Sequence, residues 1–140
     1  RYFGYDDAIY ASCRLVEILA KTTCSLSSLV ADLPNTSVTP EIRDDVSDSM
    51  KFEVVRHVQE QLAVYAKTGE ALGPSKLVVR DVVTIDGVRA IFDDGWGLIR
   101  ASNTQPALVL RFEATSPERL AMLRAVIEGE LIAAKQALGC

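Results

Sequence analysis

The chain has 140 residues, of which 49% are hydrophobic and 24% charged, and its formal net charge at pH 7 is −4. This length and composition predict one globular domain with a real core. The acidic balance argues against a broad nucleic-acid surface, although it is compatible with a small local anion site. No apolar run approaches the ~18 residues that a membrane-spanning helix needs, so we expect no membrane partner.

The beginning of the chain and its cysteines bear on the compartment. The sequence starts without Met and without a hydrophobic leader, which indicates a fragment or a processed chain and no signal peptide. The cysteines Cys13, Cys24 and Cys140 are odd in number and too widely spaced for a metal site. We expect free thiols in a reducing cytoplasm, with a structural disulfide as the alternative.

The first predicted element is a helix from Asp6 to Lys21, with two acidic residues at its positively polarised start. Arg14, Glu17 and Lys21 form one narrow polar stripe, and apolar residues cover most of the remaining surface. Such a helix needs burial on several sides. In a fragment it can fold back, pair with a second copy or stay disordered, and we expect self-association through residues 6–21 at high concentration.

A break in the chain follows this helix. A short second helix is indicated near Ser25 to Val30, and the run Asp32-Leu33-Pro34-Asn35 then interrupts regular structure. We place a domain boundary here, so that residues 1–35 form a helical segment and residues 36–140 a separate domain.

The second domain starts with a strand and a helix. Residues 36–42 have the character of a strand that Pro40 interrupts or edges. Residues 47–66 predict a helix, and residues 67–75, rich in Gly and Pro, predict a loop. The apolar face of this helix is formed by Phe52, Val55, Val58, Leu62 and Tyr65.

A series of strands and a last helix complete the domain. Strands are expected over 77–85 and 88–92, joined by Asp86-Gly87, a preferred pair for a tight hairpin, and then over 96–101 and 107–114. Ser116 and Pro117 start the final helix. Its buried face is formed by Leu120, Leu123, Ile127, Leu131 and Ala134. Two long helices and an antiparallel meander of about four strands predict a two-layer α+β domain, not a parallel doubly wound sheet.

One polar segment stands out between the last two strands. Arg100 ends the first strand, and Ser102, Asn103 and Thr104 follow it, while Arg111 lies in the next strand. A guanidinium offers a planar fork of donors that matches phosphate oxygens, and the hydroxyls, the amide and backbone N–H groups of a turn can add to it. A purely local polar turn with a surface Arg is the other interpretation, because these residue types are common in turns.

The same segment resembles the phosphate-binding loop of the α-D-phosphohexomutases, which has the pattern Arg-x-Ser-Asn-Thr-x-Pro in the last domain of the enzyme. Further resemblance lies in segments that occur here in the family's order. The matching segments are Gly4-Tyr5-Asp6-Asp7-Ala8-Ile9-Tyr10, Thr39-Pro40-Glu41-Ile42, Asp86-Gly87-Val88-Arg89, Gly95-Trp96-Gly97 and Arg100-Ala101-Ser102-Asn103-Thr104-Gln105-Pro106. The chain is most similar to the bacterial phosphomannomutase/phosphoglucomutase branch, although its loop around residues 67–76 is longer than usual there.

The resemblance implies a role in an isomerase of carbohydrate metabolism. Family members interconvert 1-phospho and 6-phospho hexoses through a phosphoserine, with Mg²⁺ assisting the transfer. The fourth domain holds the non-reacting phosphate, here through Arg100, Ser102, Asn103 and Thr104, with Arg111 as a less direct match. Residues 1–35 would then be the helical end of the third domain. The partners implied are a hexose phosphate, whose sugar the sequence leaves open, and the other three domains.

No catalytic or metal-binding residue is expected in this chain. The family's nucleophilic serine loop, Asp-rich magnesium loop and sugar-selecting motif are missing from it, so the chain alone is expected to be inactive. The pairs Asp6-Asp7 and Asp93-Asp94 suit a helix start and a turn, and His57 is expected to be solvated. The alternative function is a free-standing small-ligand-binding or regulatory α+β module.

Overall fold

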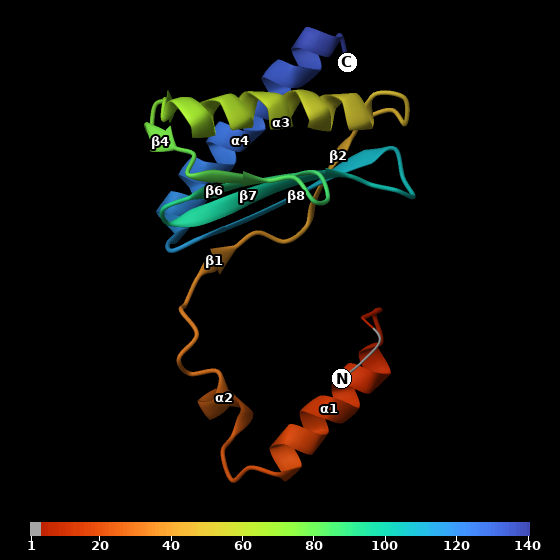
Figure 1. Cartoon of the computed structure of the whole chain (residues 1–140), viewed down its shortest axis with the longest axis vertical. Coiled ribbons are helices and arrows are strands. Elements are labelled where there is room, and N and C mark those ends of the chain that lie inside the picture. The colour runs from red at the N-terminus through yellow and green to blue at the C-terminus, as the bar shows by residue number, and fades with distance from the viewer. Residues whose placement is uncertain (1–3) are drawn as a thin grey trace. The chain divides into compact units, whose positions relative to one another are not determined.

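The computed structural model describes residues 4–140, and their contacts divide the chain into two units, Arg1–Pro34 and Asn35–Cys140. The first unit contains α1 (Ala8–Ala20) and the short α2 (Leu26–Leu29), shown in red and orange in Figure 1. Asp7 caps α1, since its carboxylate accepts a hydrogen bond of 2.8 Å from the Tyr10 amide. The helix predicted from Asp6 to Lys21 is therefore confirmed with slightly shorter bounds.

Polar and apolar residues are distributed over the surface of α1 as the sequence predicted. The polar stripe is held by ion pairs from Arg14 and Lys21 to Glu17. None of the helical residues is buried, and the apolar Ile9 and Val16 are 80% and 64% exposed. Such a helix gains little from packing within its own unit, because its apolar faces have almost no apolar surface to contact there.

The second unit is built on one antiparallel sheet. The strands lie in the order β1-β8-β7-β6-β5, and β2 pairs with β8 beside β1. The strands are β1 (Ser37–Val38), β2 (Ile42–Asp45), β5 (Asp81–Val83), β6 (Val88–Phe92), β7 (Gly95–Ala101) and β8 (Ala107–Ala114), and a separate pair consists of β3 (Ala71–Leu72) and β4 (Leu77–Val78). With α3 (Lys51–Thr68) and α4 (Pro117–Leu138), this arrangement confirms the predicted α+β class, with six strands in the sheet where about four were indicated.

Both long helices pack against the sheet, and the core lies between the two layers (Figure 1). From the helices, Val54, Val58, Leu62, Leu123 and Ile127 are almost completely buried. Gly97 of β7 admits this close packing, since a Cβ there would lie 2.9 Å from the Phe112 ring and 3.2 Å from Ile127. Because side chains alternate along a strand, the neighbouring Trp96, Leu98 and Arg100 belong to the opposite face of the sheet.

The strand expected over residues 36–42 is in fact two short strands, β1 and β2, that pair with β8 one after the other. Between them three residues of the edge face two of β8, as in a bulge. Thr39 is buried there, and its hydroxyl oxygen accepts a hydrogen bond of 3.1 Å from the Phe112 amide. Pro40, which lacks a donor, lies within this irregular stretch, as the sequence indicated.

Four other expectations need comment. The helix predicted from Ser47 begins at Lys51, because residues 47–50 form a turn. Phe52 was assigned to the buried face but is 58% exposed, and Val54 is fully buried instead. The loop and strand predicted over 67–85 contain three short strands, β3, β4 and β5. His57 is half-buried, and its buried Nδ1 has no hydrogen-bond partner among the described residues, so the expected solvation holds for only part of the ring.

Candidate functional site

The loop between β7 and β8 is closed by its own hydrogen bonds. The Ser102 amide donates to the Ala107 carbonyl at 2.9 Å. The Ser102 Oγ accepts from the amides of Thr104 and Gln105 at 3.4 and 3.2 Å. The amides of Ser102, Thr104 and Gln105 therefore bond within the loop, and in this conformation they do not form the anion nest that such a turn can provide.

The remaining donors of the loop are side chains. The Ser102 hydroxyl accepts two bonds, which leaves its O–H to donate outward and polarises that bond. Asn103 and Thr104 are exposed, and within residues 4–140 their side chains make no hydrogen bond that would compete with a ligand. The loop thus presents a row of uncharged donors beside the end of β7.

Arg100 supplies the positive charge next to this row. Its side chain is 36% exposed, and one guanidinium nitrogen lies 3.4 Å from the Asp86 carboxylate at the β5–β6 turn. This contact is long and involves one nitrogen, in contrast to a bidentate Arg–carboxylate pair. The guanidinium therefore retains most of its donors for another anion.

The β5–β6 turn packs against the backbone of Arg100. Gly87 has a φ of +79°, as a tight hairpin requires. A Cβ at this position would lie 2.3 Å from the Ile99 carbonyl oxygen and 2.7 Å from the Arg100 Cα. The turn predicted from Asp86-Gly87 is thus confirmed, and it packs directly against the strand end that carries Arg100.

Arg111 lies on the same sheet face as Arg100. Arg100 pairs with Val109 across β7 and β8, and Arg111 pairs with Leu98, so the two Arg residues are diagonal neighbours. Arg111 is exposed and has no ion-pair partner within the described part of the chain. The geometry therefore brings both predicted cations, Arg100 and Arg111, to one face of the sheet.

Two loop contacts were not foreseen from the sequence. The Lys51 ammonium donates to the Gln105 carbonyl at 3.0 Å, and Arg43 donates to the Gln105 side-chain oxygen at 2.5 Å. Both partners are more than 50 residues away along the chain. Because each bond joins residues so far apart, no local sequence pattern marks Lys51 or Arg43 as a partner of the loop.

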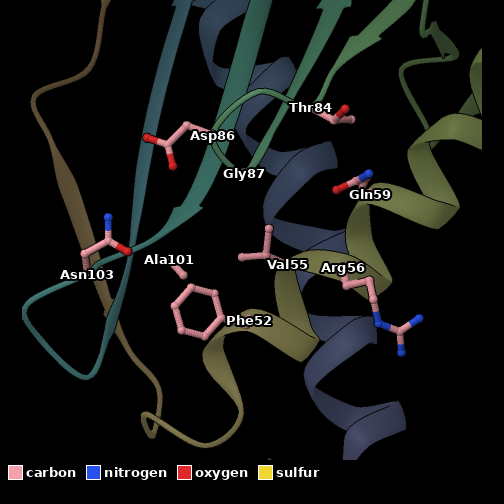
Figure 2. Close-up of a pocket in the computed structure, with 9 residues that line it drawn as sticks. All are labelled: Phe52, Val55, Arg56, Gln59, Thr84, Asp86, Gly87, Ala101 and Asn103. Carbon is pink, nitrogen blue, oxygen red and sulfur yellow. The ribbon is translucent and has the colours of Figure 1, made fainter.

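A cavity of about 170 Å³ lies beside the loop, between α3 and the β5–β6 turn (Figure 2). Phe52, Ala101 and Asn103 line one part of it. Arg56 lies at its edge, but its guanidinium is paired with Glu53 and Glu60, and the Arg56 pairing holds the pKa of Glu53 below its usual value. The Arg56 guanidinium is therefore occupied by ion pairs within its own helix, and Arg56 is a poor candidate for binding an anion.

Other kinds of site find no support in the described residues. Across residues 4–140 there is no cluster of three or more His, Cys, Asp or Glu side chains that could hold a metal ion. No helix in that part of the chain is long and apolar enough to cross a membrane. The three cysteines are free and exposed, as expected.

The fold and the loop together define a two-layer α+β domain with a cationic, donor-rich loop at one end of its sheet. Residues 41–130 match the family model described as the phosphoglucomutase/phosphomannomutase C-terminal domain, and the chain belongs to this family. The earlier resemblance to the phosphohexomutases is thereby confirmed.

Individual relatives agree with this assignment. The chain is 45% identical over 132 residues to a phosphomannomutase/phosphoglucomutase of Pseudomonas putida, covering 94% of this chain and 26% of that protein. It is 39% identical over 132 residues to a phosphoglucomutase of Neisseria meningitidis, with 91% and 26% covered. A crystal structure of a phosphoglucomutase/phosphomannomutase family protein from Burkholderia thailandensis has a TM-score of 0.68 and 38% identity, over 96% of this chain and 25% of that one. The chain thus spans about a quarter of the length of these relatives.

Proposed function

We propose that residues 36–140 form the phosphate-binding domain of a phosphohexomutase and grip the non-reacting phosphate of a hexose phosphate. Arg100 provides the charge-assisted contact, and the Ser102 hydroxyl, the Asn103 amide and the Thr104 hydroxyl add neutral donors. Arg111 adds a second positive charge on the same face of the sheet. The domain holds the substrate and does not perform chemistry on it.

The observation that carries this proposal is that Arg100 makes only a weak ion pair with the described residues. Two other cations near the loop already have partners, since Arg43 bonds Glu41 and Gln105, and Lys51 bonds Asp48 and Gln105. Within residues 4–140, the ion pairing of Arg100 is limited to a single 3.4 Å contact with the exposed Asp86 carboxylate. A phosphate can replace that contact with two parallel hydrogen bonds to the guanidinium, which is a stronger arrangement.

The whole enzyme would supply the remaining parts. We propose that the catalytic phosphoserine and the Mg²⁺ ligands of the interconversion belong to three other domains, because the described residues do not offer a cluster that fits a metal. Residues 1–35 would then be the helical end of the third domain. The chain alone is expected to have no mutase turnover, which a coupled assay for glucose 6-phosphate or mannose 6-phosphate would check.

A phosphate titration followed by NMR tests the binding site. Most sugar contacts would lie on other domains, so we expect a dissociation constant of about 1 mM, equivalent to about 4 kcal/mol. The amides of Ser102, Asn103 and Thr104 should shift first, and sulfate at the same ionic strength provides a comparison of anions. Shifts centred on another surface, or none at high phosphate, would remove the binding role from this loop.

A further inference from the structure

Lys51 is a buried cation at a position where a helix does not favour one. It is the first residue of α3 and only 4% of it is exposed. The N-terminus of a helix has a partial positive charge, and a buried ammonium loses its hydration, so both effects oppose this placement. A solvent-exposed rotamer would avoid the desolvation. The contacts of the buried ammonium must therefore compensate for its cost.

Those contacts join α3 to the loop between β7 and β8. The Lys51 Nζ donates to an Asp48 carboxylate oxygen at 2.7 Å and to the Gln105 carbonyl at 3.0 Å, and it lies 5.3 Å from the Phe52 ring centroid. The Gln105 carbonyl also accepts from the Ala107 amide at 2.8 Å. One carbonyl of the loop is thus held by two donors, one of them charged.

A neighbouring backbone contact fixes the same half of the loop. The Val46 amide donates to the Pro106 carbonyl at 3.0 Å, just after β2 ends. The second half of the loop, residues 105–107, is therefore attached to the segment that leads into α3. Among the described residues, the hydrogen bonds of the exposed half, which carries Asn103 and Thr104, come from the Ser102 hydroxyl.

We propose that Lys51 is a positioning residue for the phosphate loop, an inference that rests on the proposed function of that loop. Its ammonium holds the Gln105 carbonyl and so fixes the end of the loop from which Thr104, Asn103 and Ser102 present their donors. It also places a positive charge behind the loop, in a region shielded from water. Lys51 does not touch the phosphate but keeps the loop in the conformation that binds it.

The substitution Lys51→Met in the full 140-residue chain tests the proposal, because Met fills similar space without donors. We expect faster hydrogen exchange at the Thr104, Gln105 and Ala107 amides. If the binding conformation is then populated about a tenth to a third of the time, phosphate affinity falls about three- to tenfold. Lys51→Arg keeps a donor and should recover part of that loss.

Two matched variants separate loop positioning from charge. Lys67→Met removes one charge from the exposed far end of the same helix, and we expect wild-type exchange and phosphate affinity there. Asp48→Asn removes the exposed carboxylate but leaves the Gln105 contact, so the phosphate affinity should stay within about twofold of wild type. The proposal is overturned if Lys51→Met behaves like Lys67→Met in both measurements.

Wild-type measurements decide the remaining cases. A scalar coupling across the hydrogen bond, between the Lys51 Nζ and the Gln105 carbonyl carbon, should be detectable, and its absence would contradict the anchor even if Lys51→Met does not fold. Faster exchange in Lys51→Met together with no phosphate shift in the wild type would refute the proposed function of the loop, whereas the anchor itself would stand.

Discussion

The close contact between Gly87 and the Arg100 backbone leads to a prediction that a pair of glycines can test. Gly87 and Gly69 have similar φ values of +79° and +69°, and both would be strained as Ala. Around Gly69 nothing lies within 4 Å of an added Cβ, whereas at Gly87 the Cβ would meet the Ile99 carbonyl at 2.3 Å. The two substitutions therefore share the backbone strain and differ in the steric contact.

The expected free energies follow from this difference. Gly69→Ala should lower the free energy of unfolding by about 1–2 kcal/mol, the cost of a left-handed conformation for an L-residue. Gly87→Ala should add about 1–3 kcal/mol for the overlap with β7. Because the overlap displaces the end of β7, phosphate binding through Arg100 should also weaken in Gly87→Ala and stay unchanged in Gly69→Ala.

Urea unfolding followed by fluorescence measures these changes, since Trp96 is the chain's one Trp and lies in β7. The slope against urea should be the same in wild type and both variants, so that shifts of the midpoint report stability. Equal destabilisation by the two substitutions, within about 0.5 kcal/mol, would show that the hairpin turn does not press on Arg100 as described.

Three other predictions address the site and the pH dependence. Arg100→Ala should weaken phosphate binding about ten- to a hundredfold, because it removes the charge-assisted hydrogen bonds of the guanidinium. Arg100→Lys should recover only part of the affinity, because Lys lacks the planar fork, and NMR titration of Ser102–Thr104 measures both variants. Asp86→Asn should tighten phosphate binding about two- to fourfold at low salt, because it removes a negative charge beside the ligand. The gain should become smaller as salt is added. Unchanged affinity at low salt would argue that Asp86 does not compete with phosphate for Arg100. Burial raises the pKa of Glu130, so the folded state holds this proton more tightly than the unfolded state. The free energy of unfolding of the wild type should therefore decline as the pH rises from the usual Glu pKa through the raised one. Glu130→Gln should reduce that decline. It should also lower the pKa of Tyr65, which the Glu130 charge raises.

The parts of the fold that the sequence predicted depend on local signals. The Asp86-Gly87 pair predicted the position of the hairpin turn, and the Ser116 cap with the following Pro predicted the start of α4. Each of these signals lies within a few residues of the structure that it determines, so one sequence is enough to find it.

The parts that the sequence did not predict depend on contacts between distant residues. Lys51 and Gln105 are 54 residues apart, and Thr39 and Phe112 are 73 apart, so no local pattern relates them. The start of α3 was placed too early because the Ser-rich turn before Lys51 has the polar residues of a helix cap. Phe52 was assigned to the core from helical spacing, although that spacing cannot tell the centre of a face from its edge.

The exposed apolar surface of α1 leads to a last prediction, which concerns the chain as it stands. Ile9, Val16 and Ile18 are 80%, 64% and 51% exposed, and burying one such side chain is worth about 1.5–3 kcal/mol. Pairing of two helices through these residues would therefore gain enough free energy for association at roughly micromolar to millimolar concentrations. We expect light scattering to show concentration-dependent dimers of the full chain. A version that begins at Asn35 should remain monomeric, because the second unit has its own complete core. Val16→Asp should also give monomers without changing the stability of the second unit. If the full chain stays monomeric at millimolar concentration while α1 is helical by NMR, α1 is stable with its apolar faces in water and the reasoning from its pattern is wrong.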